Sequence, residues 1–307
     1  MVHLVYFSPD VIGEDFSQEA RQSLLIGTLL SLLQNCLLLD YIDYRFDAEI
    51  RDLIGNLPSD CRKRVQVILS SFAKNNRIVR ILEDDYSGKS DLEILVSWVS
   101  RVPLELVIED SQKRWDAGKS KVPSETIETF PMSDFERGRS ANVVRRDLAS
   151  NSITGQGFID QFLAPVFRYA EEIHIVDFAL GVHFHDDFAT TVAMLLASIA
   201  KESYFKKTLT VTFHVGVGLG RMSDHVKQVI EEAADRNGMK GQVAIKIYPD
   251  RLTGSPRPLP HDRYLSCEIG SVDIGRGFDF IDTRTKMINN TSVSLSTTSP
   301  VEVLRLL

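Results

Sequence analysis

The chain has 307 residues, of which 43% are hydrophobic and 25% are charged, and its formal net charge is −7. This length predicts about two domains, each able to bury a core without disulfide or metal staples. The acidic balance excludes a uniformly basic nucleic-acid coat, while a local basic groove is still compatible with it.

The three cysteines are scattered and form no CxxC pair, so we expect neither a disulfide framework nor a zinc site, but reduced thiols in the cytoplasm. The opening MVHLVYFSPD lacks a basic start followed by a long apolar core, so no signal peptide is expected. The most apolar stretch, residues 24–39, contains Gln34 and Asn35 and is too short for a transmembrane segment.

The first half of the chain alternates short apolar runs with segments of helical spacing. We expect strands at residues 3–7, 37–39, 78–82 and 104–108, and helices at 17–34, 47–54, 60–72 and 91–99. Strands that alternate with helices predict an α/β fold with a mainly parallel sheet. We assign residues 1–118 to this first domain.

The pattern decays after residue 110 into a polar, charged stretch interrupted by proline and glycine. Such a composition is typical of connecting segments. We therefore expect residues 119–155 to form a linker or an extended arm, with a long functional loop as the alternative.

Regular spacing resumes in the second half, which we assign to a second α/β domain at residues 156–307. We expect helices at residues 159–170, 187–200 and 223–237, and strands at 172–177, 208–215, 243–248, 264–268, 271–274 and 292–295. The strands at 264–268 and 271–274 flank Gly270 and are expected to pair antiparallel.

The segment PHDRYLSCEIGSVDIGRGFDF carries three cationic side chains. His261 and Arg263 alternate onto one face of a strand, and Arg276 lies between two glycines. A guanidinium can bind phosphate through two hydrogen bonds, and flanking glycines let backbone N–H groups approach an anion. We predict that His261, Arg263 and Arg276 bind phosphate. The alternative is that they pair with Asp262, Asp273 or Asp279 in a network that stabilises the fold.

The stretch FIDQFLAPVFRYAEEIHIVD, followed by HDR and IGRGFDF, resembles the phospholipase-D-like C-terminal domain of MIT-domain proteins over roughly residues 157–296. Active phospholipase-D-like enzymes carry HxK and a following aspartate. Here Arg263 stands in the lysine position and Glu268 in that of the aspartate. The resemblance therefore implies phosphate binding without phosphodiesterase activity, and it implies a dimer that binds an anionic ligand.

Two further histidine clusters are weaker candidates. The run HFHDD at residues 183–187 offers imidazole and carboxylate ligands for a divalent metal, or it caps the following helix. His214 precedes Gly216, Gly218 and Gly220 between a strand and a helix, where such a loop can hold phosphate.

Acidic residues follow several predicted strands of the first domain: Asp10, Asp40, Glu109 and Asp110, with Asp91 at the start of a helix. Carboxylates at the carboxyl ends of parallel strands can hold Mg²⁺ or Mn²⁺ ions, which activate water for attack on a phosphodiester. The alternative is that these acids cap helices and hydrate turns.

The segments VYFSPDVIGE, LLLDYIDYRFDAEI and SDLEILVSWVSRVPLELVIEDSQKRW resemble those of PIN-like nucleases. This resemblance implies a catalytic set of Asp10, Glu49, Asp91 and Asp110, with Asp10, Asp91 and Asp110 as ligands of Mg²⁺ or Mn²⁺. In the position of the family's opening aspartate the chain carries Ser8 rather than Asp10.

Three functions are compatible with these patterns. The first is a metal-dependent nuclease, with a place in bacterial phage defence, whose second domain binds a phosphate-bearing ligand. The second is a non-catalytic adaptor that binds anionic lipid, nucleotide or nucleic acid together with a protein partner. The third is a metal-independent phosphodiesterase that uses His261 as its nucleophile. In each case we expect a homodimer or a larger complex.

Overall fold

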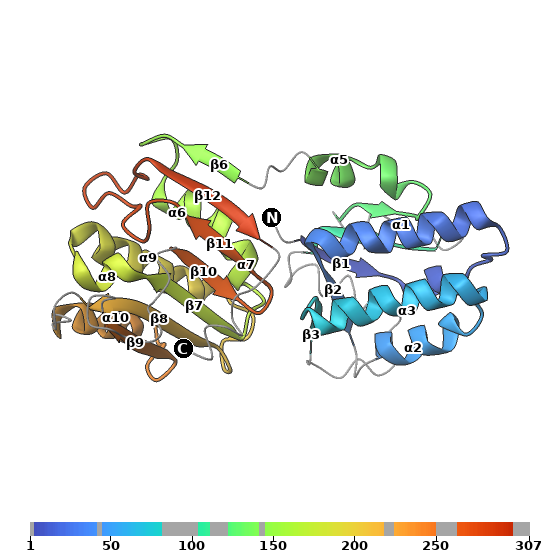
Figure 1. The fold of residues 1–307 in the computed structure, drawn as a ribbon, viewed down its shortest axis with the longest axis horizontal. Helices are drawn as coiled ribbons and strands as arrows, with labels where there is room; N and C mark the ends of the chain where they lie inside the picture. The colour runs from blue at the N-terminus through green and yellow to red at the C-terminus, as the bar shows by residue number, and fades with distance from the viewer. Residues whose placement is uncertain are drawn as a thin grey trace. The chain divides into compact units, whose positions relative to one another are not determined.

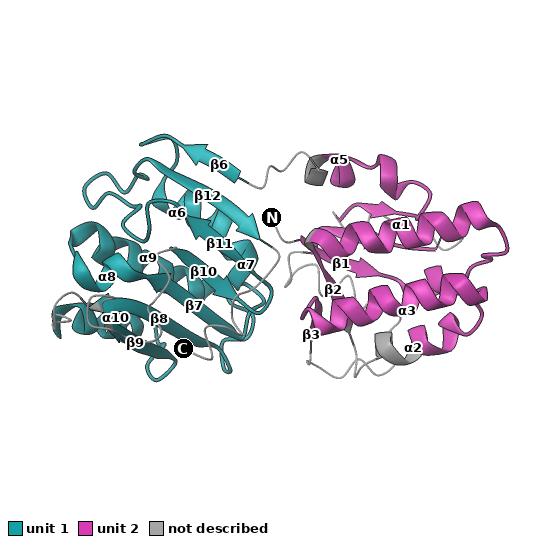
Figure 2. Ribbon diagram, in the orientation of Figure 1, with its two compact units in different colours: residues 1, 143–307 teal, residues 2–142 magenta. Residues whose placement is uncertain are grey.

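A computed structural model describes residues 3–41, 45–81, 104–110, 122–140, 145–217, 224–249 and 263–296. Within these ranges the chain forms two compact units, one inside residues 2–142 and the other inside residues 143–307 (Figure 2). Each unit has its own sheet, with helices beside it, so the predicted α/β class is confirmed.

The first unit is built on sheet A, in which every strand pair is parallel. Its strands are β1 (His3–Phe7), β2 (Cys36–Tyr41), β3 (Ile78–Ile81), β4 (Leu106–Ile108) and β5 (Ser124–Glu125), in the order β3-β2-β1-β4-β5. The chain thus runs outward from β1 to β3 and then returns to the other side of β1. The predicted parallel sheet is confirmed, and β5 was not expected.

Helices α1 and α3 of this unit lie side by side on one face of sheet A (Figure 1). The helical segments are η1 (Pro9–Gly13), α1 (Glu19–Asn35), α2 (Arg45–Ile54), α3 (Ser59–Lys74), η2 (Phe130–Met132) and α5 (Asp134–Ser140). The buried residues of α3 (Cys61, Val65, Ile68 and Phe72) recur every three or four positions and form its apolar stripe. This stripe packs with α1 over Val5 and Phe7 of β1. The helix predicted at residues 91–99 lies outside the described residues.

The second unit is built on sheet B, a mixed sheet. Its strands are β6 (Arg145–Leu148), β7 (Glu172–Asp177), β8 (Thr210–Val217), β9 (Val243–Pro249), β10 (Tyr264–Cys267), β11 (Gly270–Ile274) and β12 (Thr291–Ser296), in the order β6-β12-β11-β10-β7-β8-β9. Strands β7, β8 and β9 are parallel, and the other pairs are antiparallel. The predicted antiparallel pair β10–β11 is confirmed.

Among the helices of the second unit, the first one differs most from the prediction. The helices are α6 (Gly155–Phe158), the wide turn η3 (Ile159–Leu163), α7 (Ala164–Phe167), α8 (Phe178–Val182), α9 (Asp186–Glu202) and α10 (Asp224–Arg236). The helix predicted at residues 159–170 begins earlier because the Thr154 hydroxyl accepts the Gly157 amide at 3.0 Å and caps it. Pro165 lacks an N–H, so the regular hydrogen-bond ladder widens just before it.

The segment expected to be a linker, residues 119–155, contributes to both sheets. It supplies β5 to sheet A, and it supplies β6, whose residue Leu148 pairs with Thr291 of β12, to sheet B. β6 has the sequence RRDL and lies at the edge of its sheet with mostly exposed side chains. An edge strand that buries no face has no apolar alternation, which is why hydropathy did not reveal it.

Among the helices in the described parts of the chain, none combines the length and apolar character needed to cross a bilayer.

Candidate functional sites

The carboxyl edge of sheet A brings two of the predicted acids to neighbouring strands. β1 and β4 are adjacent and parallel, and the Ser8 amide donates to the Ile108 carbonyl at 2.8 Å just beyond their ends. Asp10 follows β1 within η1, and Asp110 follows β4. Since the strand order reverses between β1 and β4, this is the switch point of the sheet, where open α/β sheets bind their ligands.

The acids along this edge differ in their surroundings. Asp10 is exposed and Asp110 is half-buried. Asp40, on β2, is only 2% exposed, and its Oδ2 lies 3.4 Å from Nε of Arg80 on β3, which stands opposite it in the sheet. A cation thus already balances the charge of Asp40.

The remaining members of the predicted catalytic set are not placed. Glu49 belongs to α2, but its side chain is outside the described part of the structure, and Asp91 lies outside the described residues altogether. Among the side chains that are described, no three His, Cys, Asp or Glu residues form a group able to hold a metal. The described carboxylates therefore supply at most part of a metal centre, although their oxygen atoms are the ligand type that Mg²⁺ and Mn²⁺ prefer.

Two of the three predicted phosphate-binding residues, Arg263 and Arg276, lie near the ends of β7, β10 and β11. Arg263 directly precedes β10, whose first residue pairs with Val176 of β7. Its Nε lies 3.7 Å from Oδ1 of Asp177, and its Nη1 donates to the backbone carbonyl of Arg276. The strand pairing thus brings Arg263 and Arg276 together. His261 lies outside the described residues.

The carboxylate of Asp177 occupies the turn that follows β11. Asp177 has no exposed surface, and its two oxygens accept the amides of Ala179 and Phe278, each at 2.8 Å. Burial raises the pKa of Asp177, and the Phe278 amide and the Arg263 guanidinium act in the opposite direction. The glycine-flanked turn therefore does bind an anion through its backbone, but that anion is a carboxylate of its own chain.

Arg276 likewise has an acidic neighbour. Its Nε lies 3.3 Å from Oδ1 of Asp279, and neither atom makes a hydrogen bond within the described residues. Oδ2 of Asp279 lies 3.6 Å from Nε2 of His185. The turn after β11 and its neighbours thus hold two guanidiniums, of Arg263 and Arg276, and two carboxylates. The side chains of the two arginines are still 36% and 38% exposed. An added phosphate would compete with Asp279 for Arg276.

Two acids singled out by the sequence have structural contacts. Glu268 accepts the amides of Glu171 and Glu172 and anchors the start of β7. Asp187, from the HFHDD run, accepts the amide and the hydroxyl of Thr283 at 2.9 and 2.7 Å. These contacts explain both carboxylates without a metal or a substrate.

A cluster that the sequence did not reveal crosses sheet B. Glu172, His174, His214 and Tyr248 form a continuous chain of hydrogen bonds. The signal for it was the alternation in EIHIVD and TVTFHVGV, which places both histidines on the polar phase of their strands. Sequence alone had connected His214 with the glycine-rich loop after it.

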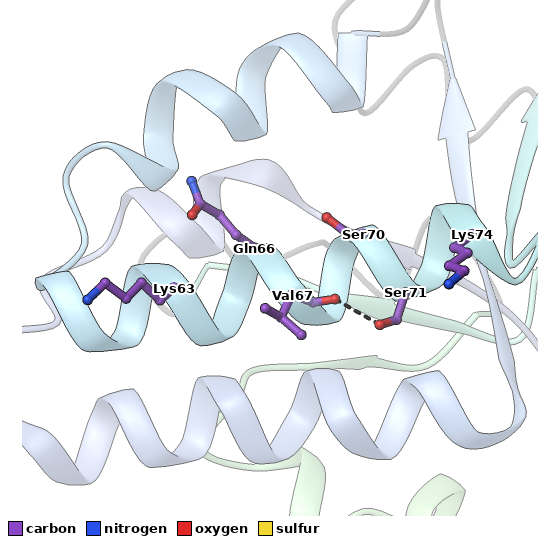
Figure 3. A pocket seen from close by; sticks show the side chains of 6 residues that line it. All are labelled: Lys63, Gln66, Val67, Ser70, Ser71 and Lys74. Atoms are coloured by element: carbon purple, nitrogen blue, oxygen red, sulfur yellow. Dashed lines mark hydrogen bonds between the residues drawn. The ribbon is translucent and has the colours of Figure 1, made fainter.

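The outward face of α3 contains an open hollow of about 430 Å³ (Figure 3). All of its lining residues come from this helix: Lys63, Gln66, Val67, Ser70, Ser71 and Lys74. The Ser71 hydroxyl donates to the Val67 carbonyl of the same helix, at 2.8 Å. None of the predicted site residues lines the hollow, so it is separate from the two candidate sites.

No protein-family model matches the chain, and no curated protein is similar to it.

Proposed function

We propose that the protein is a metal-dependent nuclease whose reaction centre lies at the carboxyl edge of sheet A. The observation that supports this most strongly is the placement of Asp10 and Asp110 after two adjacent parallel strands, on either side of the switch point. Carboxylates in this position suit Mg²⁺ or Mn²⁺. Such an ion would activate water for in-line attack on a phosphodiester. Glu49 and Asp91 complete the proposed set.

In this proposal the second unit positions the phosphate backbone of the nucleic acid. Arg263 and Arg276 support it because both side chains are more than one third exposed despite their acidic neighbours. His261 is the third proposed phosphate ligand. We further propose that the protein acts in the cytoplasm as a homodimer, in bacterial phage defence. Its cysteines, Cys36, Cys61 and Cys267, are all free and buried, in keeping with a reducing compartment.

The test is cleavage of labelled single-stranded RNA and DNA with Mn²⁺, by the wild type and by Asp110→Asn. We expect the wild type to cleave and EDTA to stop it. Asp110→Asn should lower the rate more than about 100-fold, since even outer-shell partners of metal ligands are worth roughly 10–100-fold. The matched control is Asp134→Asn, which removes an exposed carboxylate from α5 of the same unit. Equal rates for all three proteins, or no cleavage at all, would rule the proposal out.

The second candidate is a non-catalytic adaptor that binds a phosphate-bearing ligand and a protein partner. It is favoured by one observation: Arg263 and Arg276 lie together at the turn after β11, and their side chains are 36% and 38% exposed. Its test is the binding of a 5′-phosphorylated oligonucleotide, and of vesicles containing phosphatidylserine, without turnover. Arg276→Ala should weaken binding, and Arg284→Ala, which removes an exposed arginine of the same unit, should not. Binding that is equal in both variants would contradict it.

A further inference from the structure

Strands β7, β8 and β9 lie side by side in sheet B (Figure 1). Four titratable side chains are hydrogen-bonded in sequence across these three parallel strands. Oε1 of Glu172 lies 2.8 Å from Nε2 of His174, and Nδ1 of His174 lies 2.8 Å from Nε2 of His214. Nδ1 of His214 lies 2.7 Å from the hydroxyl of Tyr248. Every nitrogen of the two imidazole rings therefore has a partner within this hydrogen-bonded series.

The strand register explains why the four side chains meet. His174 stands opposite Thr212, so His214 lies two residues beyond that position on β8. His214 stands opposite Lys246, and Tyr248 lies two residues beyond that position on β9. Diagonal neighbours on one face are within reach of long and aromatic side chains. The chain thus runs from the start of β7 toward the carboxyl end of β9.

Burial fixes the charge of His214 and Tyr248. His174, His214 and Tyr248 are 2%, 0% and 6% exposed. Burial, helped by His174 and Lys246, lowers the pKa of His214 to about 3, and burial raises the pKa of Tyr248. His214 is therefore a neutral imidazole at physiological pH, with one N–H and one acceptor nitrogen, and Tyr248 keeps its proton.

A neutral His214 permits two proton arrangements. In the first, Tyr248 donates to Nδ1 of His214, Nε2–H of His214 donates to Nδ1 of His174, and Nε2–H of His174 donates to the Glu172 carboxylate. In the second, His174 is an imidazolium that donates to both neighbours, and Nδ1–H of His214 donates to the Tyr248 oxygen. The second arrangement holds one more proton than the first.

We propose that this chain is a one-proton switch, in which protonation of His174 beside Glu172 reverses the hydrogen bonds as far as Tyr248. The net change adds one proton. One hydrogen passes from Nε2 of His214 to Nδ1 of His174. A second passes from the Tyr248 hydroxyl to Nδ1 of His214. The incoming proton then binds to the Tyr248 oxygen and restores the hydroxyl. The positive charge ends on His174, next to the Glu172 carboxylate.

Both ends of this hydrogen-bonded series have polar or charged neighbours. Glu172 is a quarter exposed, and Ser266 of β10 stands opposite His174 on the same face. Lys246 of β9 opposes a charge on His214. Tyr248 packs against Val176, with Phe178 and Tyr264 beside them, and these two aromatic residues directly follow Asp177 and Arg263. The switch thus changes whether the Tyr248 hydroxyl donates to His214 or accepts from it, in a cluster that adjoins Asp177 and Arg263. This holds whether or not the protein is a nuclease.

Two-bond ¹H–¹⁵N correlation spectra of the full chain, labelled at histidine, test the switch. As the pH is lowered from neutral toward the pKa of His214, which is about 3, we expect His214 to change from the Nε2–H to the Nδ1–H form without becoming charged. The same transition should give His174 a positive charge. Glu172→Gln should shift the transition to a roughly tenfold higher proton concentration, because the carboxylate that stabilises the imidazolium is gone.

The matched control is Glu171→Gln, which removes the neighbouring exposed carboxylate outside the chain. It should leave the transition where the wild type has it. A His214 ring that keeps one tautomer over the whole range, or that takes up the charge itself, would overturn the proposal without any use of the variants. So would identical transitions in Glu172→Gln and Glu171→Gln.

Discussion

Gly277 and Asp177 lie so close together that a β-carbon on residue 277 would stand 2.5 Å from Oδ2 of Asp177. Gly277 also has a φ of 98°, in the region that residues with a β-carbon rarely adopt. The absence of a side chain here lets the turn after β11 close over the buried carboxylate and donate the Phe278 amide to it.

The first prediction is that Gly277→Ala lowers the free energy of unfolding by more than about 2 kcal/mol. The positive φ alone costs roughly 1–2 kcal/mol in a residue with a β-carbon, and the methyl group would also displace the Asp177 carboxylate and the Arg263 side chain. Urea unfolding followed by circular dichroism measures the change.

Gly241 is the matched control for this substitution. Its φ is 80°, and a β-carbon there would meet nothing within 4 Å. Gly241→Ala should therefore show only the backbone cost of about 1–2 kcal/mol. If both variants lost the same stability, the close approach of Gly277 to Asp177 would contribute nothing.

The second prediction concerns the pH dependence of stability. Because burial raises the pKa of Asp177 above its unfolded value, the folded chain binds this proton more tightly. The resulting stabilisation is present below the ordinary aspartate pKa and is lost as the pH rises through the raised, folded-state pKa. Asp177→Asn lacks this contribution. The difference in unfolding free energy, wild type minus variant, should therefore fall as the pH increases from about 4.

Asp282 provides a control of opposite sign. Hydrogen bonds from the Thr285 amide and hydroxyl lower the pKa of Asp282. Its contribution is present above the ordinary aspartate pKa and is lost as the pH falls through the lowered one. In urea unfolding across the acidic range, the wild type minus Asp282→Asn difference should rise with pH. Parallel trends for the two variants would contradict the role of burial at Asp177.

The third prediction concerns the glycine that follows His214. A β-carbon on Gly216 would stand 2.1 Å from the ring of Phe178, which begins α8. Gly216→Ala should therefore destabilise the fold by about 1–3 kcal/mol through overpacking. Gly27→Ala, in α1, has open space around its β-carbon and should be neutral or stabilising by up to about 1 kcal/mol. Thermal unfolding of both variants measures the contrast, and a stable Gly216→Ala would leave phosphate binding as the better reason for this glycine.

Much of the fold could be predicted because its strands and helices carry strong periodic patterns. β1 and the pair β10–β11 bury alternating or continuous apolar residues, and α3 has a clear apolar stripe. The misses are elements without such patterns. β6 is an exposed edge strand, and α8 is a short helix that begins at Phe178, after its N-cap residue Asp177, whose side chain accepts the Ala179 amide. Local hydropathy carries no information about either.

The candidate sites show the same limit at the level of single residues. Residue type suggested that Arg263 binds an anion, but its anionic neighbour Asp177 is set by the pairing of β10 with β7. Likewise, Tyr248 joins His214 only through the register of β8 and β9. Register arises from the packing of whole sheets, so a single sequence identifies chemical groups more readily than their partners.

The last prediction tests the backbone hydrogen bond from Ser8 to Ile108, which links the ends of β1 and β4 next to Asp10 and Asp110. Ser8 has φ −65° and ψ 129°, a conformation that proline adopts freely, so Ser8→Pro would remove little except the amide that donates to the Ile108 carbonyl. We expect a loss of about 1–3 kcal/mol in urea unfolding, because a buried carbonyl loses its partner. Ser8→Ala keeps the amide and should be nearly neutral. If the proposed nuclease activity depends on this edge, Mn²⁺-dependent cleavage should fall in Ser8→Pro under conditions where it is still folded, and equal cleavage by the two variants would show that this hydrogen bond does not position the acids.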